Sequence, residues 1–136
     1  MANVPLYVMD SASLIELERS ETLGQLRILR QYILIPGRVV REVTRARTFK
    51  GRTPKLVTLL GNYKGEQFIG AEGSLYLTLI ITPGIDDGEA AAIAMAYYRK
   101  LPMVTEERIA SNLAQDLGII CLKAAEFVDK VRPHLL

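Results

Sequence analysis

The 136-residue chain is predicted to fold as a three-layer α/β/α domain around a central, mostly parallel sheet of about five strands. Two observations predict this class. Short, uniformly apolar segments alternate with longer amphipathic stretches, which is the pattern of parallel strands covered by helices on both faces. Hydrophobic residues make up 49% of the chain and charged residues 24%, enough to bury a core. Because no repeat, low-complexity segment or linker divides the sequence, residues 1–136 are expected to form one domain.

The first half of the chain is expected to hold two strands and several helices. Residues 4–10 (VPLYVMD) form a buried strand that ends on a carboxylate. Residues 13–32 form two helices, with Ser20 or Thr22 as a cap near the break. Residues 33–36 (ILIP) form the second strand, and a helix follows over 38–49. Residues 50–74 have the weakest pattern, with one short helix over 54–60.

The second half is expected to alternate strands and helices. Residues 74–83 (SLYLTLIITP) form a strand, because they are rich in β-branched and aromatic residues. The strongest helix covers 86–100, with acids in its first turn and bases in its last. A strand over 101–105, a helix over 106–118 and a strand over 119–122 follow, and residues 123–136 form a closing helix and tail.

Composition excludes several functional classes. The single cysteine, Cys121, and the single histidine, His134, exclude a disulfide scaffold, a zinc site and a Ser-His-Asp triad. No apolar run reaches the roughly 18 residues of a transmembrane helix, and the first residues lack the pattern of a secretory signal. The expected compartment is therefore the cytoplasm, with no membrane partner. No Gly-rich phosphate loop of a common type is present.

Carboxylates follow four of the predicted strands, at the edge where open parallel sheets bind ligands. They are Asp10, Glu42, Asp86, Asp87, Glu89, Glu106 and Glu107. An acid that begins a helix is, taken alone, more commonly a cap, and Glu42 alone is more commonly a solvated helix residue. Asp10 differs from these, because it ends the expected central strand, where a buried acid is costly without a partner.

Carboxylates that meet at one edge repel one another and raise one another's pKa unless a cation neutralises them. A divalent metal is the simplest such cation. In a chain with almost no histidine or cysteine, an all-oxygen Mg²⁺ or Mn²⁺ site fits better than zinc. A centre of this kind can polarise a phosphodiester and activate water.

Four segments resemble the PIN domain, the metal-dependent nuclease family that includes the VapC-type toxins of toxin–antitoxin pairs. They are YVMDSASLIEL (7–17), ILIPGRVVREV (33–43), DDGEAAAIAMA (86–96) and VTEERIASNLAQDLGIICL (104–122). They occur in the family's order over nearly the whole chain, and the middle of the chain, residues 50–74, carries no usable resemblance.

The resemblance implies a metal-dependent ribonuclease. Its four acids fall on Asp10, Glu42, Glu89 and Glu107, which would bind Mg²⁺ or Mn²⁺ and serve RNA hydrolysis. Thr105 matches the threonine before the fourth acid. The candidate supporting residues are Ser11, Ser13, Asp87, Thr105 and Glu106. The resemblance also implies a homodimer and an antitoxin protein as partners.

Two departures from the family pattern keep a second reading open. Ala12 stands where the family usually has Ser, Thr or Asn, and Glu107 stands where it usually has Asp. The alternative is a catalytically degenerate PIN-like module that binds RNA or a protein partner. A third hypothesis, a phosphotransfer domain with Asp10 as nucleophile, is weaker because the Asp-x-Asp pattern of such phosphatases is absent.

The net charge of +2 hides a basic segment. Residues 38–55 hold seven bases and one acid, and the spacing of Arg38, Arg41 and Arg45 puts them on one helical face. Such a face is either simply solvated, a track for RNA phosphates, or a contact for an acidic antitoxin or a second copy. Because Glu42 lies on the same helix, RNA contact is favoured.

Overall fold

The computed structural model describes residues 5–45 and 54–135, and its centre is a parallel sheet. The described strands are β1 (Tyr7–Met9), β2 (Ile33–Leu34), β3 (Met103–Val104) and β4 (Cys121–Leu122). They pair in the order β2-β1-β3-β4, all parallel, with Val8 opposite Leu34 on one side and Met103 on the other. β1 is therefore central, as predicted.

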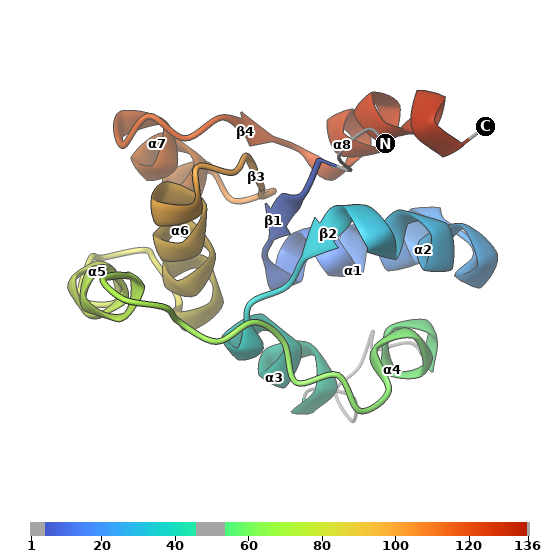
Figure 1. The fold of residues 1–136 in the computed structure, drawn as a ribbon, viewed down its shortest axis with the longest axis horizontal. Helices are drawn as coiled ribbons and strands as arrows, with labels where there is room; N and C mark the ends of the chain where they lie inside the picture. Colours follow the sequence, from blue (N-terminus) through green and yellow to red (C-terminus); the bar gives the residue numbers. More distant parts are fainter. Residues whose placement is uncertain (1–4, 46–53, 136) are drawn as a thin grey trace.

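Helices surround the sheet (Figure 1). They are α1 (Ser11–Ser20), α2 (Leu23–Leu29), α3 (Gly37–Arg45), α4 (Pro54–Leu60), α5 (Glu72–Leu79), α6 (Asp87–Arg99), α7 (Arg108–Asp116) and α8 (Ala124–Val131). Short 3₁₀ helices cover Arg30–Tyr32 and Arg132–Leu135. None of the helices in the described part of the chain is long and apolar enough to cross a membrane.

The three layers follow from the alternation of side chains along each strand. Met9 and Val104 face a core shared with α1, α2, α3, α4 and α8. Val8 and Met103 point the other way, into a core shared with α5, α6 and α7. Figure 1 shows these two helix groups on opposite sides of the strands. The predicted α/β/α class is therefore confirmed, with four strands among the described residues rather than about five.

The strand predicted over 74–83 is wrong, because α5 occupies its first part. Glu72, Tyr76 and Leu79 are buried at helical spacing, whereas Leu77 and Ile81 are exposed. The β-branched run Ile80–Ile81–Thr82 follows the helix instead of forming a strand. Among the residues described, one isolated parallel bridge, Pro36 to Glu66, extends the pairing beyond β2.

Other elements lie close to their predicted places. The first helix begins at Ser11 rather than residue 13, and Thr22 caps α2 by accepting a hydrogen bond from the Gln25 N–H at 3.2 Å. The short helix at residues 54–60 is present as α4. The helix predicted over 38–49 runs from Gly37 to Arg45, and the rest of that range lies outside the described residues.

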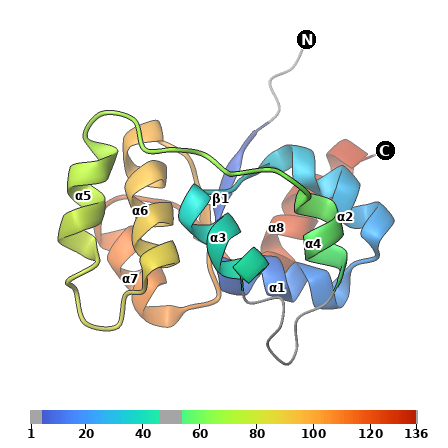
Figure 2. The ribbon, with the colours of Figure 1, turned by 90° about the horizontal axis from the view of Figure 1, so that it is seen from below.

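α3 occupies the middle of the molecule and carries one of the predicted acids. Figure 2 shows it between α6 on one side and α1 and α4 on the other. The segment after α4 crosses directly over the start of α3, where the Gly37 N–H donates to the Glu66 carbonyl at 2.8 Å. A side chain at Gly65 would meet the Gly37 Cα at 2.6 Å, so the crossing requires glycine there.

Candidate active site

The carboxyl end of β1 places Asp10 at the centre of the sheet edge. Its side chain is 1% exposed and caps α1, with Oδ1 accepting from the Ser13 N–H at 3.0 Å. Oδ2 accepts from the Thr105 hydroxyl at 2.5 Å, across from β1 to the end of β3. Burial raises the pKa of Asp10, and these two hydrogen bonds oppose that rise. Thr105 therefore acts as a direct partner of Asp10.

Glu42 reaches the same edge from the second turn of α3. Its Oε1 accepts a hydrogen bond from the Ser11 hydroxyl at 3.0 Å. A Cβ at Gly88, in the first turn of α6, would stand only 1.9 Å from the same oxygen. Glu42 therefore fits between α1 and α6 because Ser11 supplies a hydroxyl and Gly88 lacks a side chain.

Glu89 and Asp86 form the start of α6 as a reciprocal pair. The Glu89 N–H donates to Asp86 Oδ1 at 2.8 Å, and the Asp86 N–H donates to Glu89 Oε1 at 3.0 Å. Glu89 is 6% exposed. Its carboxylate therefore has a structural role at the helix start in addition to its place at the acidic edge.

The acidic side chains act on one another electrostatically. Burial, followed by the charge of Asp86, raises the pKa of Glu42 to about 7. Burial also raises the pKa of Glu89 to about 7, and the charges of Asp86, Asp10 and Glu107 add to the rise. Raised carboxyl pKa values of this kind mark a place where acids are buried close to one another.

Glu107 stands at the rim of this edge. It is exposed, it precedes the first residue of α7, and its backbone N–H donates to the Thr105 hydroxyl at 3.1 Å. Thr105 thus connects Glu107 to Asp10. The structure brings the carboxylates of Asp10, Glu42 and Glu89 to one edge, with Glu107 beside them.

Two of the predicted supporting acids, Glu106 and Asp87, make their contacts outside the cluster of Asp10, Glu42 and Glu89. Glu106 Oε2 accepts from the Ala124 N–H at 2.7 Å and so caps α8. Asp87 accepts a hydrogen bond from the Tyr76 hydroxyl and lies 3.6 Å from Arg38 Nη1. Of the serines, Ser11 contacts Glu42 through its hydroxyl, and Ser13 contacts Asp10 through its backbone N–H.

The basic residues lie beside the acids on α3. The Arg38 guanidinium sits 5.0 Å above the ring of Tyr76, in addition to its contact with Asp87. Arg41 and Arg45 are exposed on the same helix. The further bases of this segment, Arg47, Lys50 and Arg52, lie outside the described residues. Lys55 serves the fold, because its ammonium donates to the Glu21 carbonyl at 3.0 Å.

Sequence reasoning placed Asp86 at the acidic edge but not among the candidate site residues, and it omitted Gly88 and Tyr76. The role of Asp86 had a detectable signal, since Asp-x-x-Glu at the start of a helix is a capping-box pattern. Gly88 and Tyr76 had none, because their contacts with Glu42 and Asp87 join segments distant in the sequence.

The residues present suit a hard divalent cation. Their donor set is carboxylate oxygen, and burial together with neighbouring acidic charge raises the pKa values of Glu42 and Glu89, an effect that a bound cation would oppose. Within residues 5–45 and 54–135, no three acidic, histidine or cysteine side chains already form a metal cluster. The carboxylates are instead held by protein hydrogen bonds from Ser11, Ser13 and Thr105.

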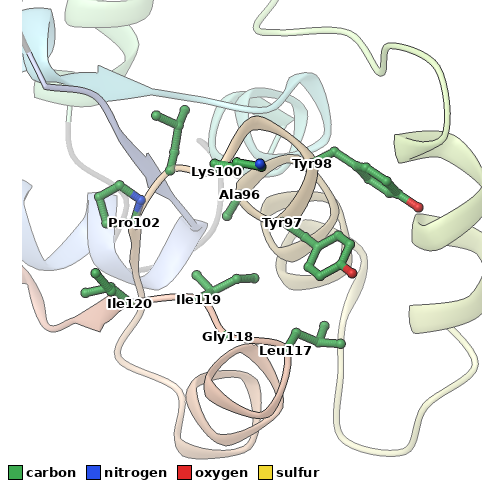
Figure 3. A pocket seen from close by; sticks show the side chains of 10 residues that line it. Ala96, Tyr97, Tyr98, Lys100, Pro102, Leu117, Gly118, Ile119 and Ile120 are labelled. Atoms are coloured by element: carbon green, nitrogen blue, oxygen red, sulfur yellow. The ribbon is translucent and has the colours of Figure 1, made fainter.

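A cavity of about 520 Å³ lies at the opposite end of the sheet. Figure 3 shows the side chains of Tyr97, Leu117, Ile119 and Ile120 gathered around it. It adjoins the residues that precede β3 and β4, and none of the acids of the carboxyl edge lines it. Although it is large, this cavity is therefore separate from the acidic site.

The fold and the site together define a class of protein. It is an α/β/α domain whose parallel sheet carries a cluster of buried acids at its carboxyl edge. A protein-family model described as a PIN domain matches residues 6–130, so the chain belongs to the PIN-domain family. Proteins of this family are generally nucleases and typically use divalent metal ions. A comparison with curated proteins found no match.

Proposed function

We propose that this PIN domain is a metal-dependent ribonuclease that hydrolyses RNA phosphodiester bonds. The observation that carries the proposal is the buried Asp10 at the end of the central strand, electrostatically coupled to Glu42 and Glu89, whose pKa values are raised to about 7. An edge with this much crowded negative charge is suited to a Mg²⁺ or Mn²⁺ ion.

The residues have distinct roles in this proposal. Asp10, Glu42, Glu89 and Glu107 would hold the metal, which would supply Lewis-acid polarisation of the phosphodiester and activation of water. Ser11 and Thr105 orient Glu42 and Asp10 through their hydroxyls. Arg38, Arg41 and Arg45 on α3 contact RNA phosphates next to the acids.

Two features of the structure support competence despite the departures from the family pattern. Ala12 lies within the first turn of α1, and the neighbouring Ser11 supplies a hydroxyl to the site. Glu107 is exposed at the rim, so its longer side chain has room to move.

The direct test is RNA cleavage by Asp10→Asn. The purified protein is incubated with mixed-sequence RNA in Mg²⁺, in Mn²⁺ and in EDTA. The wild type is expected to cleave only with a metal, and Asp10→Asn is expected to lose roughly 100-fold or more, the scale of losing one catalytic group. Asp129→Asn makes the same change at an exposed position of α8 and is expected to cleave like the wild type.

The alternative function gives a different result in this assay. A degenerate module would bind the RNA but leave it intact with every metal, and that outcome would contradict the ribonuclease proposal.

The role as a toxin, the antitoxin partner and the homodimer stay predictions. Exposed apolar side chains on and beside α5, among them Leu77 and Ile81, provide a surface suited to a protein contact.

A further inference from the structure

A second cavity lies directly beside Glu107, at the carboxyl ends of β3 and β4. Its volume is about 510 Å³, within the range of small-molecule sites. α7 lines one side, the start of α8 lines another, and Cys121 and Leu122 of β4 contribute the apolar part. Because Thr105 and Glu107 also line it, the cavity adjoins the candidate active site.

α7 presents a polar face to this cavity. Arg108, Ser111, Asn112 and Gln115 recur at steps of three and four residues, which places them on one side of the helix. The opposite side carries Ala110 and Ala114, which are fully buried. Asn112 and Gln115 are exposed, and the Gln115 amide donates to the Ser111 hydroxyl at 3.1 Å. The wall beside the acidic edge therefore displays two side-chain amides.

The acidic and basic side chains around the cavity differ in whether they already have a partner. Glu106 and Glu126 also line it, but their carboxylates accept hydrogen bonds from the Ala124 and Lys123 N–H groups at 2.7 and 2.9 Å. Arg108 and Lys123 form no ion pair within the part of the chain that the structure describes. Glu106 and Glu126 thus each have one carboxylate oxygen bound to the start of α8, and Glu107 lines the side next to the acidic edge. Arg108 and Lys123 are available to an anionic ligand.

We propose, building on the ribonuclease function above, that this cavity binds one base of single-stranded RNA beside the bond to be cleaved. The amides of Asn112 and Gln115 both donate and accept hydrogen bonds, as reading the edge of a base requires. Leu122 contacts the base's apolar face, and Arg108 and Lys123 contact the flanking phosphates. The subsite gives the nuclease a base preference at one position next to its cleavage site.

The first test is the sequence preference of cleavage. Wild type, Asn112→Ala and Gln115→Ala are given an RNA with a randomised segment in Mn²⁺, and the cleaved ends are sequenced. We expect the wild type to prefer one base at a fixed position and at least one variant to lose about tenfold of that preference. Gln25→Ala, an exposed amide on α2, is the matched control and is expected to keep it.

The second test separates this inference from the proposed function. Binding of fluorescent oligo-A, oligo-C, oligo-G and oligo-U RNA is measured by anisotropy in EDTA, where no cleavage is needed. A wild-type preference that Asn112→Ala or Gln115→Ala removes supports the subsite even if no RNA is ever cleaved. Equal wild-type binding of all four oligonucleotides, or an unchanged preference in both variants, overturns it. Thermal unfolding checks that each variant is folded.

Discussion

At the scale of single residues, the site depends on a glycine as much as on its acids. Glu42 lies against the backbone of Gly88, on the first turn of another helix, and any side chain at position 88 would displace its carboxylate. Asp10 is similarly fixed, since both of its oxygens accept hydrogen bonds. The carboxylates are therefore held in place by neighbours that carry no charge.

Gly88→Ala tests this dependence. The new Cβ would stand 1.9 Å from Glu42 Oε1, so the carboxylate has to move. RNA cleavage is expected to fall by about 100-fold, because displacing a catalytic group by about 1 Å has effects of that size. The measurement is the cleavage rate in Mn²⁺, with circular dichroism to confirm folding.

Gly73→Ala is the matched control for Gly88→Ala. It makes the same change in α5, where an added Cβ meets nothing within 4 Å. It is expected to leave cleavage unchanged and to stabilise the helix by about 0.5–1 kcal/mol. Full activity in a folded Gly88→Ala variant would show that Glu42 need not occupy its present position.

At the scale of elements, one ion-pair network attaches α5 to α6. Arg99 Nε donates to Glu72 Oε2 at 2.8 Å, and Arg99 Nη1 donates to Glu66 Oε1 at 3.0 Å. The Glu72 side chain is 3% exposed. Burial alone would raise the pKa of Glu72, but the hydrogen bonds from Arg99 and the Ile69 N–H hold it below its usual value.

Glu72→Gln is expected to loosen α5. The amide keeps the shape and can still accept from the Ile69 N–H, but Arg99 loses the more buried of its two charged partners and keeps only Glu66. The free energy of unfolding is expected to fall by about 2–3 kcal/mol, as for a largely buried pair that loses one partner. Urea unfolding measures this value. Glu16→Gln on α1 makes the same change without such a pair and should unfold like the wild type; an equal loss in both variants would contradict the role of the network.

A second contact between elements involves a buried acid on the opposite side of the sheet, where α1 packs against α4. Glu18 of α1 is fully buried, and its Oε2 accepts from the Leu56 N–H of α4 at 2.7 Å. This hydrogen bond satisfies a backbone donor in the first turn of α4. α4 is therefore positioned by α1, and not only by its own apolar residues Leu56 and Leu60.

At the scale of the whole molecule, the crowded acids connect stability to pH and to metal. The pKa values of Glu42 and Glu89 are raised to about 7 from an ordinary 4.5, so between these pH values the folded protein binds more protons than the unfolded chain. The free energy of unfolding therefore falls as the pH rises through this window. A cation that binds the ionised carboxylates of the folded state offsets the loss.

Thermal unfolding at pH 5 and pH 8 checks this relation. In EDTA, the wild type is expected to lose more stability from pH 5 to pH 8 than the double variant Glu42→Gln/Glu89→Gln. Mn²⁺ is expected to raise the unfolding temperature of the wild type at pH 8 and to have little effect at pH 5. Identical pH dependence in the two proteins would show that these carboxyl groups do not carry the effect.

The fold and the main acids could be predicted largely from local sequence. Largely apolar runs of four to seven residues between amphipathic stretches identified all four strands of the described part of the chain, and the order of elements then placed Asp10 at the end of the central one. The failure at 74–83 has a local cause. β-branched residues favour a strand, but burial of Glu72, Tyr76 and Leu79 against α6 made the segment before Ile80 helical.

The sequence by itself determined the α/β/α class, the parallel sheet and the oxygen-rich character of the candidate centre, because these depend on periodicity and residue type. Only the tertiary structure decided which acids face one another. It directed Glu106 to α8 and Asp87 to Arg38, and placed Glu42 against Gly88. The reason is physical: a carboxylate's pKa and partners are set by groups brought close through folding, and sequence spacing does not specify those distances.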